Sequence, residues 1–213
     1  MKKPIILIDN GHGVGTPGKC SPDALAEKYS SPYWFKEYLW CREIAQRCCD
    51  VLQVMGYDAW LLVPEDNDVP LATRVKRVND FCKTYGKDNV ILISIHNDAA
   101  GNGKNWMNAR GWSIFTTKGI TEADKLAECI YLQAVKEFRP PLRVRSYSPV
   151  KYGHDFEENY YILMHSYCPA VLIENFFQDN KEDVEYLKSF KGKGSCIHVI
   201  TEGVKEYIKS RYA

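Results

Sequence analysis

Four short apolar runs along the chain predict β-strands that are buried on both faces. The first of them ends at Asn10-Gly11, a pair typical of turns. Continuous apolar runs of this kind are typical of parallel sheets that helices cover on both sides. The runs span residues 4–9, 59–63, 90–95 and 170–173, and a further strand is predicted at 111–117.

Between these runs the apolar positions follow a helical period. The segment 71–85 places Val75, Val78 and Cys82 on one face, and the segment 121–138 opens with the pattern of a capping box. Strands that alternate with helices predict a three-layer α/β fold, with a mostly parallel twisted sheet of about six strands and helices on both faces. The helices are predicted at 33–55, 71–85, 121–138, 181–190 and 195–212.

Length and composition fit a single folded domain over residues 1–213, with 45% hydrophobic and 26% charged residues. Lys and Arg number 28 against 27 Asp and Glu, so the net charge of +1 gives no reason to expect nucleic acid as a partner. The apolar run near the start is too short for a signal peptide or a membrane helix, so we expect no membrane insertion and a cytoplasmic location as encoded. The segment 140–158, rich in Arg, Tyr, Ser and Pro, is predicted as a long loop.

Eight cysteines are spread along the chain without a C-x-x-C pair. The spacing therefore matches neither a zinc finger nor a redox motif, and a chain of this length needs no disulfides to stabilise it. We expect reduced structural thiols at Cys20, Cys41, Cys48, Cys49, Cys82, Cys129, Cys168 and Cys196.

The stretch Gly13–Gly18 matches the glycine pattern of dinucleotide-binding proteins, G-x-G-x-x-G. That motif requires a helix to begin at its third glycine, where the helix N-terminus holds the pyrophosphate. Here Lys19-Cys20-Ser21-Pro22 continues a loop, so we do not interpret the stretch as a dinucleotide site.

Polar residues follow three of the predicted strands at their carboxyl ends. His12 follows the first strand, His96 ends the third, and Glu174 ends the last. Because ligands of open α/β sheets bind at the carboxyl edge, two histidines and a glutamate there suit a metal site or an acid–base site.

A third metal ligand is sought on the long helix, which offers Glu37 and Glu43. Helix geometry puts Glu37 about 20° and Glu43 about 100° from the inward-facing Ile44. We therefore predict Glu37 as the ligand and Glu43 as a solvent-facing charge. Glu174 is then free to act as a general base, the alternative being a buried acid that pairs with Arg74 or Arg110.

At these positions the chain resembles the zinc-dependent N-acetylmuramoyl-L-alanine amidases of the amidase-3 type. The resemblance implies hydrolysis of the amide that joins the lactyl group of N-acetylmuramic acid to L-alanine in peptidoglycan. It also implies that His12, Glu37 and His96 are zinc ligands, that Glu174 is the catalytic carboxylate, and that peptidoglycan or a muropeptide is the partner. The segments that carry it are Asn10–Gly13, Glu37, Leu71–Asn79, Ser94–Asn97 and Pro169–Phe177 with Asn180.

Substrate contacts are expected from residues that flank these ligands. They are Lys19 in the loop after the first strand, Asn97 beside His96, and Arg143 in the basic and aromatic segment 143–152. The sequence departs from the family after the second histidine, where Asp98-Ala99-Ala100 stands. The remaining histidines, His154, His165 and His198, are expected to be structural or surface residues.

Two alternative functions stay open at this point. A zinc carboxypeptidase or other exopeptidase would use Arg143 or Arg145 to hold a terminal carboxylate, and a peptidoglycan-binding module would keep the fold without turnover. Nitrogen and oxygen ligands would also accept cobalt or manganese in place of zinc. The resemblance is compatible with a phage lysin, with a recycling enzyme or with an exported protein, and the expected site of action is the cell wall. The sequence predicts no oligomeric state.

Overall fold

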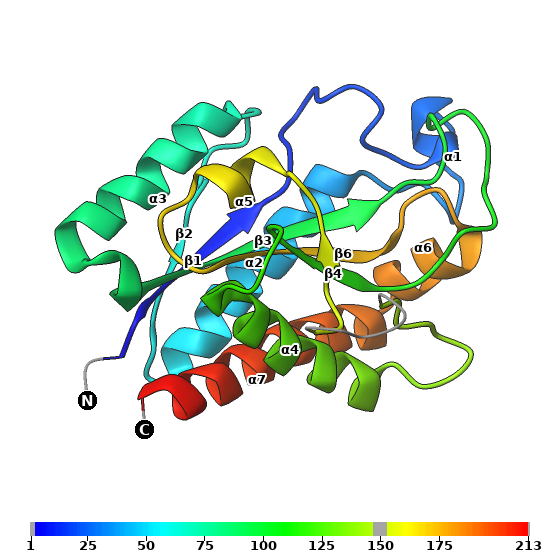
Figure 1. Cartoon of the computed structure of the whole chain (residues 1–213). Helices are drawn as coiled ribbons and strands as arrows, with labels where there is room; N and C mark the ends of the chain where they lie inside the picture. The colour runs from blue at the N-terminus through cyan, green and yellow to red at the C-terminus, as the bar shows by residue number, and fades with distance from the viewer. Residues whose placement is uncertain (1–2, 147–152, 213) are drawn as a thin grey trace.

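The computed structural model describes residues 3–146 and 153–212, which form a six-stranded sheet with helices on both faces (Figure 1). The strands are β1 (Ile5–Asn10), β2 (Asp58–Leu61), β3 (Val90–Asp98), β4 (Ser113–Thr116), β5 (Phe156–Glu157) and β6 (Ala170–Phe177). The helices are α1 (Pro22–Leu25), α2 (Glu37–Val54), α3 (Leu71–Tyr85), α4 (Glu122–Glu137), α5 (Tyr161–His165), α6 (Lys181–Lys188) and α7 (Phe190–Tyr212), with a 3-10 turn at Lys87–Asn89.

The strand order is β2-β1-β3-β6-β4-β5, and the first four of these strands run parallel. The fifth, β4, runs antiparallel to β6, and β5 pairs with β4 in parallel. The predicted three-layer, mostly parallel α/β fold of about six strands is thus confirmed. One correction falls in the segment 140–158, whose described part contains the short strand β5 where we predicted only a loop. The long helix predicted from residue 33 begins at Glu37, because residues 33–36 form the end of the preceding loop.

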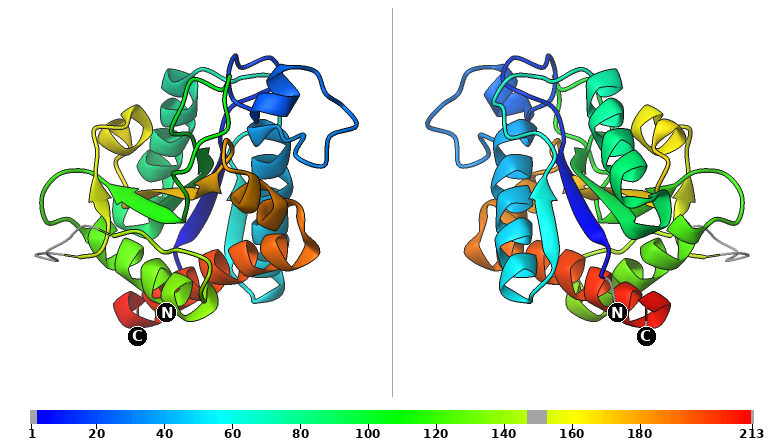
Figure 2. Two further views of the ribbon diagram at one scale, coloured as in Figure 1. Left: turned by 90° about the vertical axis from the view of Figure 1, so that its right-hand side faces the viewer. Right: turned by 90° about the vertical axis from the view of Figure 1, so that its left-hand side faces the viewer.

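The two faces of the sheet pack against different helices, as the two side views show (Figure 2). Strand side chains alternate between faces, so Ile6 and Ile8 of β1 join one core while Ile5 and Leu7 join the other. The larger core lies against α2, α4 and α7, and the smaller one against α3 and α5. The same alternation puts Asp9, His96 and Glu174 on the side of α3 and α5, whereas α2 lies on the opposite side.

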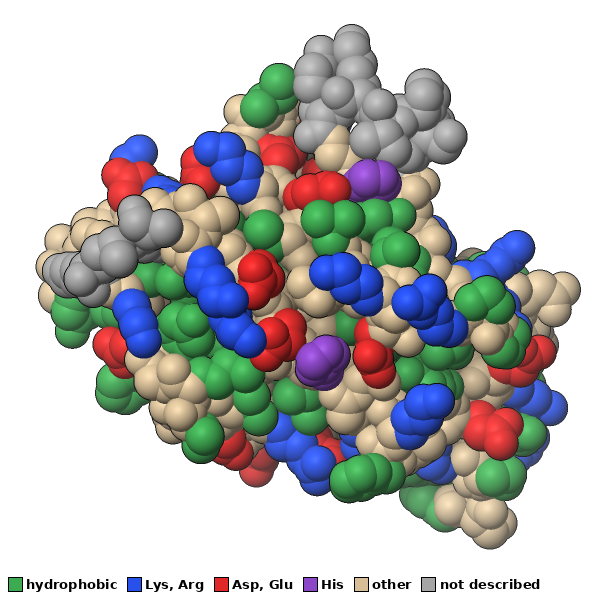
Figure 3. All heavy atoms as spheres, turned by 90° about the horizontal axis from the view of Figure 1, so that it is seen from below, with side chains coloured by type: hydrophobic (Ala, Val, Ile, Leu, Met, Phe, Trp, Pro, Cys, Tyr) green, Lys and Arg blue, Asp and Glu red, His purple; other side chains and the backbone are tan. Residues whose placement is uncertain are grey.

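The described cysteines are all free thiols, as predicted, and all of them except Cys20 and Cys129 are buried. None of the helices, over the described residues, combines the length and the hydropathy that crossing a membrane requires. The face formed by α4 and α7 carries side chains of both charges interspersed with hydrophobic ones (Figure 3).

Helix α7 packs closely against α4 at Gly203. A Cβ atom placed on Gly203 would lie 2.5 Å from the Cα of Ile130, a backbone atom that cannot move away cheaply. Gly194, in the same helix, has open space where its Cβ would be.

These two glycines give a matched pair of substitutions. Gly203→Ala is expected to lower the free energy of unfolding by about 1–3 kcal/mol, because overpacking outweighs the better helix propensity of alanine. Gly194→Ala is expected to raise it by about 0.5–1 kcal/mol through propensity alone. Urea unfolding curves of the two variants test the close approach, and a neutral Gly203→Ala would contradict it.

Candidate metal centre and catalytic cleft

His12 follows β1 in a conformation that few side-chain-bearing residues adopt, with a φ of +61°. Its carbonyl oxygen accepts hydrogen bonds from Arg42 Nη1 at 3.0 Å and Arg74 Nη2 at 3.2 Å, which hold this backbone in place. The glycine before it is required, because a Cβ on Gly11 would lie 2.5 Å from Nδ1 of His96. The turn therefore brings the two imidazole rings together, with centroids 4.9 Å apart and planes at 90°.

Glu37 is the first residue of α2 and reaches the two histidines from the opposite face of the sheet. Its Oε1 lies 3.3 Å from Nε2 of His12 and 3.2 Å from Nδ1 of His96. The carboxylate also accepts hydrogen bonds from the Asn97 backbone N–H at 3.1 Å and from Gln178 Nε2 at 3.1 Å. Burial works to raise the pKa of Glu37, but its contacts with both histidines lower that pKa well below its ordinary value. Glu37 is thus held as a carboxylate.

These three side chains have the donor types and spacing of a tetrahedral metal site. One ligand atom from each of His12, Glu37 and His96 lies within 4.8 Å of the other two. Bonds of about 2.0–2.1 Å to a tetrahedral zinc ion put neighbouring ligand atoms about 3.3 Å apart. The two distances from Glu37 Oε1 to the histidine nitrogens, 3.3 and 3.2 Å, are close to this value, and the two nitrogens lie within 4.8 Å of each other. Nε2 of His12 is buried and has the Glu37 carboxylate as its close polar neighbour among the described residues, an arrangement that suits two ligands of one metal ion.

Glu174 stands beside this triad, because strand pairing puts it opposite His96. Its Oε2 is buried and has no hydrogen-bond partner among the described residues. Burial, followed by the negative charges of Glu37 and Asp98, raises the pKa of Glu174 well above its ordinary value. The alternative pairing of Glu174 with Arg74 or Arg110 is wrong. Arg74 pairs with Asp9, and Arg110 pairs with Glu182 and Asp183.

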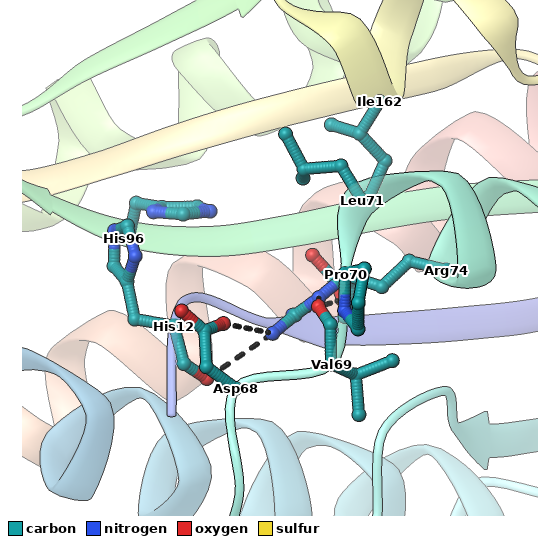
Figure 4. Close-up of a pocket in the computed structure, with 9 residues that line it drawn as sticks. His12, Asp68, Val69, Pro70, Leu71, Arg74, His96 and Ile162 are labelled. Carbon is teal, nitrogen blue, oxygen red and sulfur yellow. Dashed lines mark hydrogen bonds and ion pairs between the residues drawn. The ribbon is translucent and has the colours of Figure 1, made fainter. Parts of the chain in front are cut away.

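Arg74 of α3 joins the end of β1 to the loop before α3. Its Nη1 donates to Asp9 Oδ1 at 2.8 Å and to the Asn10 carbonyl at 2.5 Å, and Nη2 reaches Asp68 as well as His12 (Figure 4). Both side chains of the Arg74–Asp9 pair are buried, and Ser94 Oγ donates to the second Asp9 oxygen at 2.6 Å. This network fixes the strand end that carries His12.

Arg74→Met is expected to lower the free energy of unfolding by about 3–5 kcal/mol, because it leaves the buried carboxylate of Asp9 without its counter-charge. Lys76→Met, on the same helix, removes an exposed ion pair with Asp80 and should leave stability almost unchanged. Urea unfolding of both variants makes the comparison. A similar small effect from both would show that the Arg74–Asp9 pair contributes little.

A cleft of about 320 Å³ opens beside the triad and Glu174. A second hollow of about 360 Å³ adjoins it and is lined by Asp68, Pro70 and Arg74 together with both histidines (Figure 4). The first cleft is lined by His12, Lys19, Leu71, His96, Asn97, Asp98, Ala99, Tyr160, Tyr161, Ile162, Leu172 and Glu174. Its lining therefore includes the two histidines of the triad, Glu174 and the aromatic start of α5.

The three predicted substrate contacts lie in different settings. Lys19 and Asn97 line the cleft, but the Asn97 side chain is buried, and its Nδ2 donates to the Asn175 carbonyl at 2.6 Å. Arg143 is exposed and does not line the described cleft. Its neighbour Arg145 lies closer to the site and pairs with Asp98 at 2.7 Å.

Glu43 and the other histidines lie outside the triad. Glu43 is half-buried and pairs with Arg47 and Lys193, so it is less solvent-facing than we expected. His154 stacks on Tyr131 with ring centroids 4.2 Å apart and contacts Glu128, and His165 and His198 are exposed.

Sequence reasoning missed two residues that orient the triad. Gln178 contacts Glu37 from beyond the end of β6, and Arg42 holds the His12 carbonyl from α2. Arg42 lies five positions after Glu37, so both are near the N-terminal end of α2. Five positions correspond to a rotation of about 140° around a helix, so no local pattern marked Arg42, and none marked Gln178.

Together the fold and the triad define an α/β protein with a candidate metal centre at the carboxyl edge of its sheet. The sequence matches the family described as N-acetylmuramoyl-L-alanine amidase (Amidase_3) over residues 6–206, and the chain belongs to this family.

Individual relatives are distant but cover nearly the whole chain. N-acetylmuramoyl-L-alanine amidase AmiC of Neisseria meningitidis serogroup B is 23% identical, over 98% of this chain and 54% of that protein. The chain thus spans about half the length of this curated relative. The crystal structure of N-acetylmuramoyl-L-alanine amidase from Clostridium difficile 630 superposes with a TM-score of 0.74 at 24% identity, covering 99% of this chain and all of that one. The catalytic domain of CwlV from Bacillus (Paenibacillus) polymyxa gives a TM-score of 0.75 at 17% identity, covering 97% of this chain and 98% of that one. At these identities the two structures support the fold.

Proposed function

We propose that this protein hydrolyses the amide bond between the lactyl group of N-acetylmuramic acid and L-alanine in peptidoglycan. Membership of the amidase family supports the choice of bond. The observation that carries the proposal is the position of Glu174 beside the His12–Glu37–His96 triad, at the wall of one open cleft. The cell wall, or muropeptides derived from it, is accordingly the proposed site of action.

We propose zinc as the metal, held by His12, Glu37 and His96, because two imidazoles and one carboxylate are a common ligand set of catalytic zinc. When bound, zinc supplies Lewis acidity toward a substrate carbonyl and toward water. The carboxylate of Glu37 balances part of its charge, and the hydrogen bonds from Asn97 and Gln178 keep that carboxylate oriented.

Glu174 is the proposed general base and then the general acid. Its carboxylate takes a proton from the attacking water and returns it to the nitrogen of the departing L-alanine. Its buried oxygen has no hydrogen-bond partner among the described residues, so it is free to exchange a proton. Burial and acidic neighbours raise its pKa, which makes it a better proton acceptor than an ordinary surface carboxylate.

We retain Lys19 as a direct substrate contact and assign Asn97 to positioning Glu37, because the amide of Asn97 is already engaged by β6. Arg143 as a substrate contact stays a prediction.

The exopeptidase hypothesis assigned a terminal carboxylate to Arg143 or Arg145, and neither arginine is placed to hold one, because Arg143 is exposed and does not line the described cleft. Arg145 is engaged, since it hydrogen-bonds to Asp98 and Ser113 and its guanidinium lies 4.9 Å from the Phe177 ring centre. A binding module without turnover would have no use for an unpaired buried carboxyl such as that of Glu174. Both observations favour the amidase.

Mass spectrometry of a defined muropeptide, incubated with zinc-loaded protein, tests the proposal. The expected products are a sugar with an intact lactyl group and a peptide with a free L-alanine amine. Release of single amino acids from the peptide carboxyl end would indicate an exopeptidase instead. Binding of the muropeptide without any product would favour the binding module.

A further inference from the structure

Lys19 lies in the loop between β1 and α1, and its backbone is fixed beside the triad. Its carbonyl oxygen accepts a hydrogen bond from the Glu37 N–H at 3.2 Å, which ties the loop to the start of α2. The next residue, Cys20, forms an antiparallel bridge with Lys36. The lysine side chain is therefore carried on an anchored backbone and is half-buried.

The side chain of Lys19 borders two adjoining hollows. It lines the cleft that contains Glu174, and it also lines a polar hollow of about 240 Å³ formed by the loop 15–20, α1 and Tyr38. Lys19 thus stands where an extended ligand would pass from the reacting centre toward α1.

The positive charge of Lys19 works to lower the pKa of Glu174, but the two side chains do not form an ion pair. Within the described part of the chain, no hydrogen bond or ion pair reaches Nζ of Lys19, although Asp98 and Glu174 line the same cleft. Asp98 is already neutralised by Arg145. Lys19 is the one lysine or arginine among the described residues that line this cleft. A cation that lines the cleft without an ion pair is available for a charge-assisted hydrogen bond to an anionic group on the ligand.

We infer that Lys19 selects substrates that carry a free carboxylate on the residue following the L-alanine of the scissile amide. This inference rests on the proposed function. In peptidoglycan that residue is a D-glutamyl group joined to the next residue through its side-chain carboxyl, so its α-carboxyl is left free or is converted to a carboxamide. The free form offers Lys19 a charge-assisted hydrogen bond close to the reacting centre, and the carboxamide does not.

The test compares two soluble disaccharide–tetrapeptides that differ only in this group, one with the α-carboxylate and one with the carboxamide. The zinc-loaded protein is expected to cleave the carboxylate form with a kcat/KM higher by roughly ten- to a hundredfold. Lys19→Met is expected to abolish this preference, because it lowers kcat/KM for the carboxylate form much more than for the carboxamide form. Lys19→Arg should keep most of the preference.

Lys104→Met is the matched control, since it removes the same charge from an exposed position in a loop that packs near Gly18. It should leave the preference unchanged. Equal cleavage of both compounds by the unaltered protein overturns the inference and leaves the proposed function standing. An equal loss on both compounds in Lys19→Met also overturns it, because Lys19 would then serve the reaction itself. Cleavage of neither compound overturns the proposed function as well.

Discussion

Glu174→Gln is expected to lower kcat on a muropeptide by about 10² to 10⁴-fold, the usual contribution of a general acid–base group. Glutamine keeps the size of the side chain but cannot accept and return a proton. The triad does not include Glu174, so bound zinc should stay near one equivalent per chain. Steady-state kinetics and metal analysis of the same purified sample measure both properties.

Stability separates a catalytic role of Glu174 from a structural one. Because burial and the charges of Glu37 and Asp98 disfavour the ionised form, the neutral amide should fold at least as well as the acid. Glu43→Gln is the control, an acid on α2 that pairs with Arg47 and Lys193, and its activity should stay within about twofold of the unaltered protein. Normal turnover by Glu174→Gln would remove the proposed base. Loss of metal in that variant would make Glu174 a ligand.

The buried strands could be predicted from the sequence, and so could the carboxyl ends of those strands, where the site lies. In an α/β chain a short, continuous apolar run is best interpreted as a buried strand, and parallel strands bring their carboxyl ends to one edge of the sheet. The choice of Glu37 over Glu43 also followed from geometry, because rotation of 100° per residue fixes which face of a helix each side chain occupies. The structure agrees, with Glu37 at the triad and Glu43 in ion pairs away from it.

The partners of buried charges were harder to predict, as the rejected pairing of Glu174 shows. Alternation along β1 puts Asp9 on the same face as Ile5 and Leu7, which face α3, the helix that carries Arg74. This alternation follows from the sequence alone, but the distance between the side chains of Asp9 and Arg74 depends on how α3 packs against the sheet. The short strand β5 has two residues, too few for any period to be recognised.

His96→Ala is expected to abolish zinc binding and activity together, because it removes one of the three proposed protein ligands. Zinc that binds the folded state stabilises it by a free energy that grows with the ratio of the free zinc concentration to Kd. Added zinc should therefore raise the Tm of the unaltered protein. The same addition should leave the Tm of His96→Ala unchanged. His12→Ala and Glu37→Ala are expected to behave alike, and the exposed His198 provides the control substitution, His198→Ala.

A graded comparison distinguishes the ligands from the groups that only orient them. Gln178 donates to Oε2 of Glu37 at 3.1 Å, whereas both histidines contact Oε1. Gln178→Ala should therefore weaken zinc binding by about 10- to 100-fold without abolishing it. Equilibrium dialysis against a zinc buffer ranks the variants, and the expected order of affinity is the unaltered protein, then Gln178→Ala, then the three ligand variants. If Glu37→Ala binds zinc as tightly as Gln178→Ala, Glu37 only orients the histidines, and another acid completes the site.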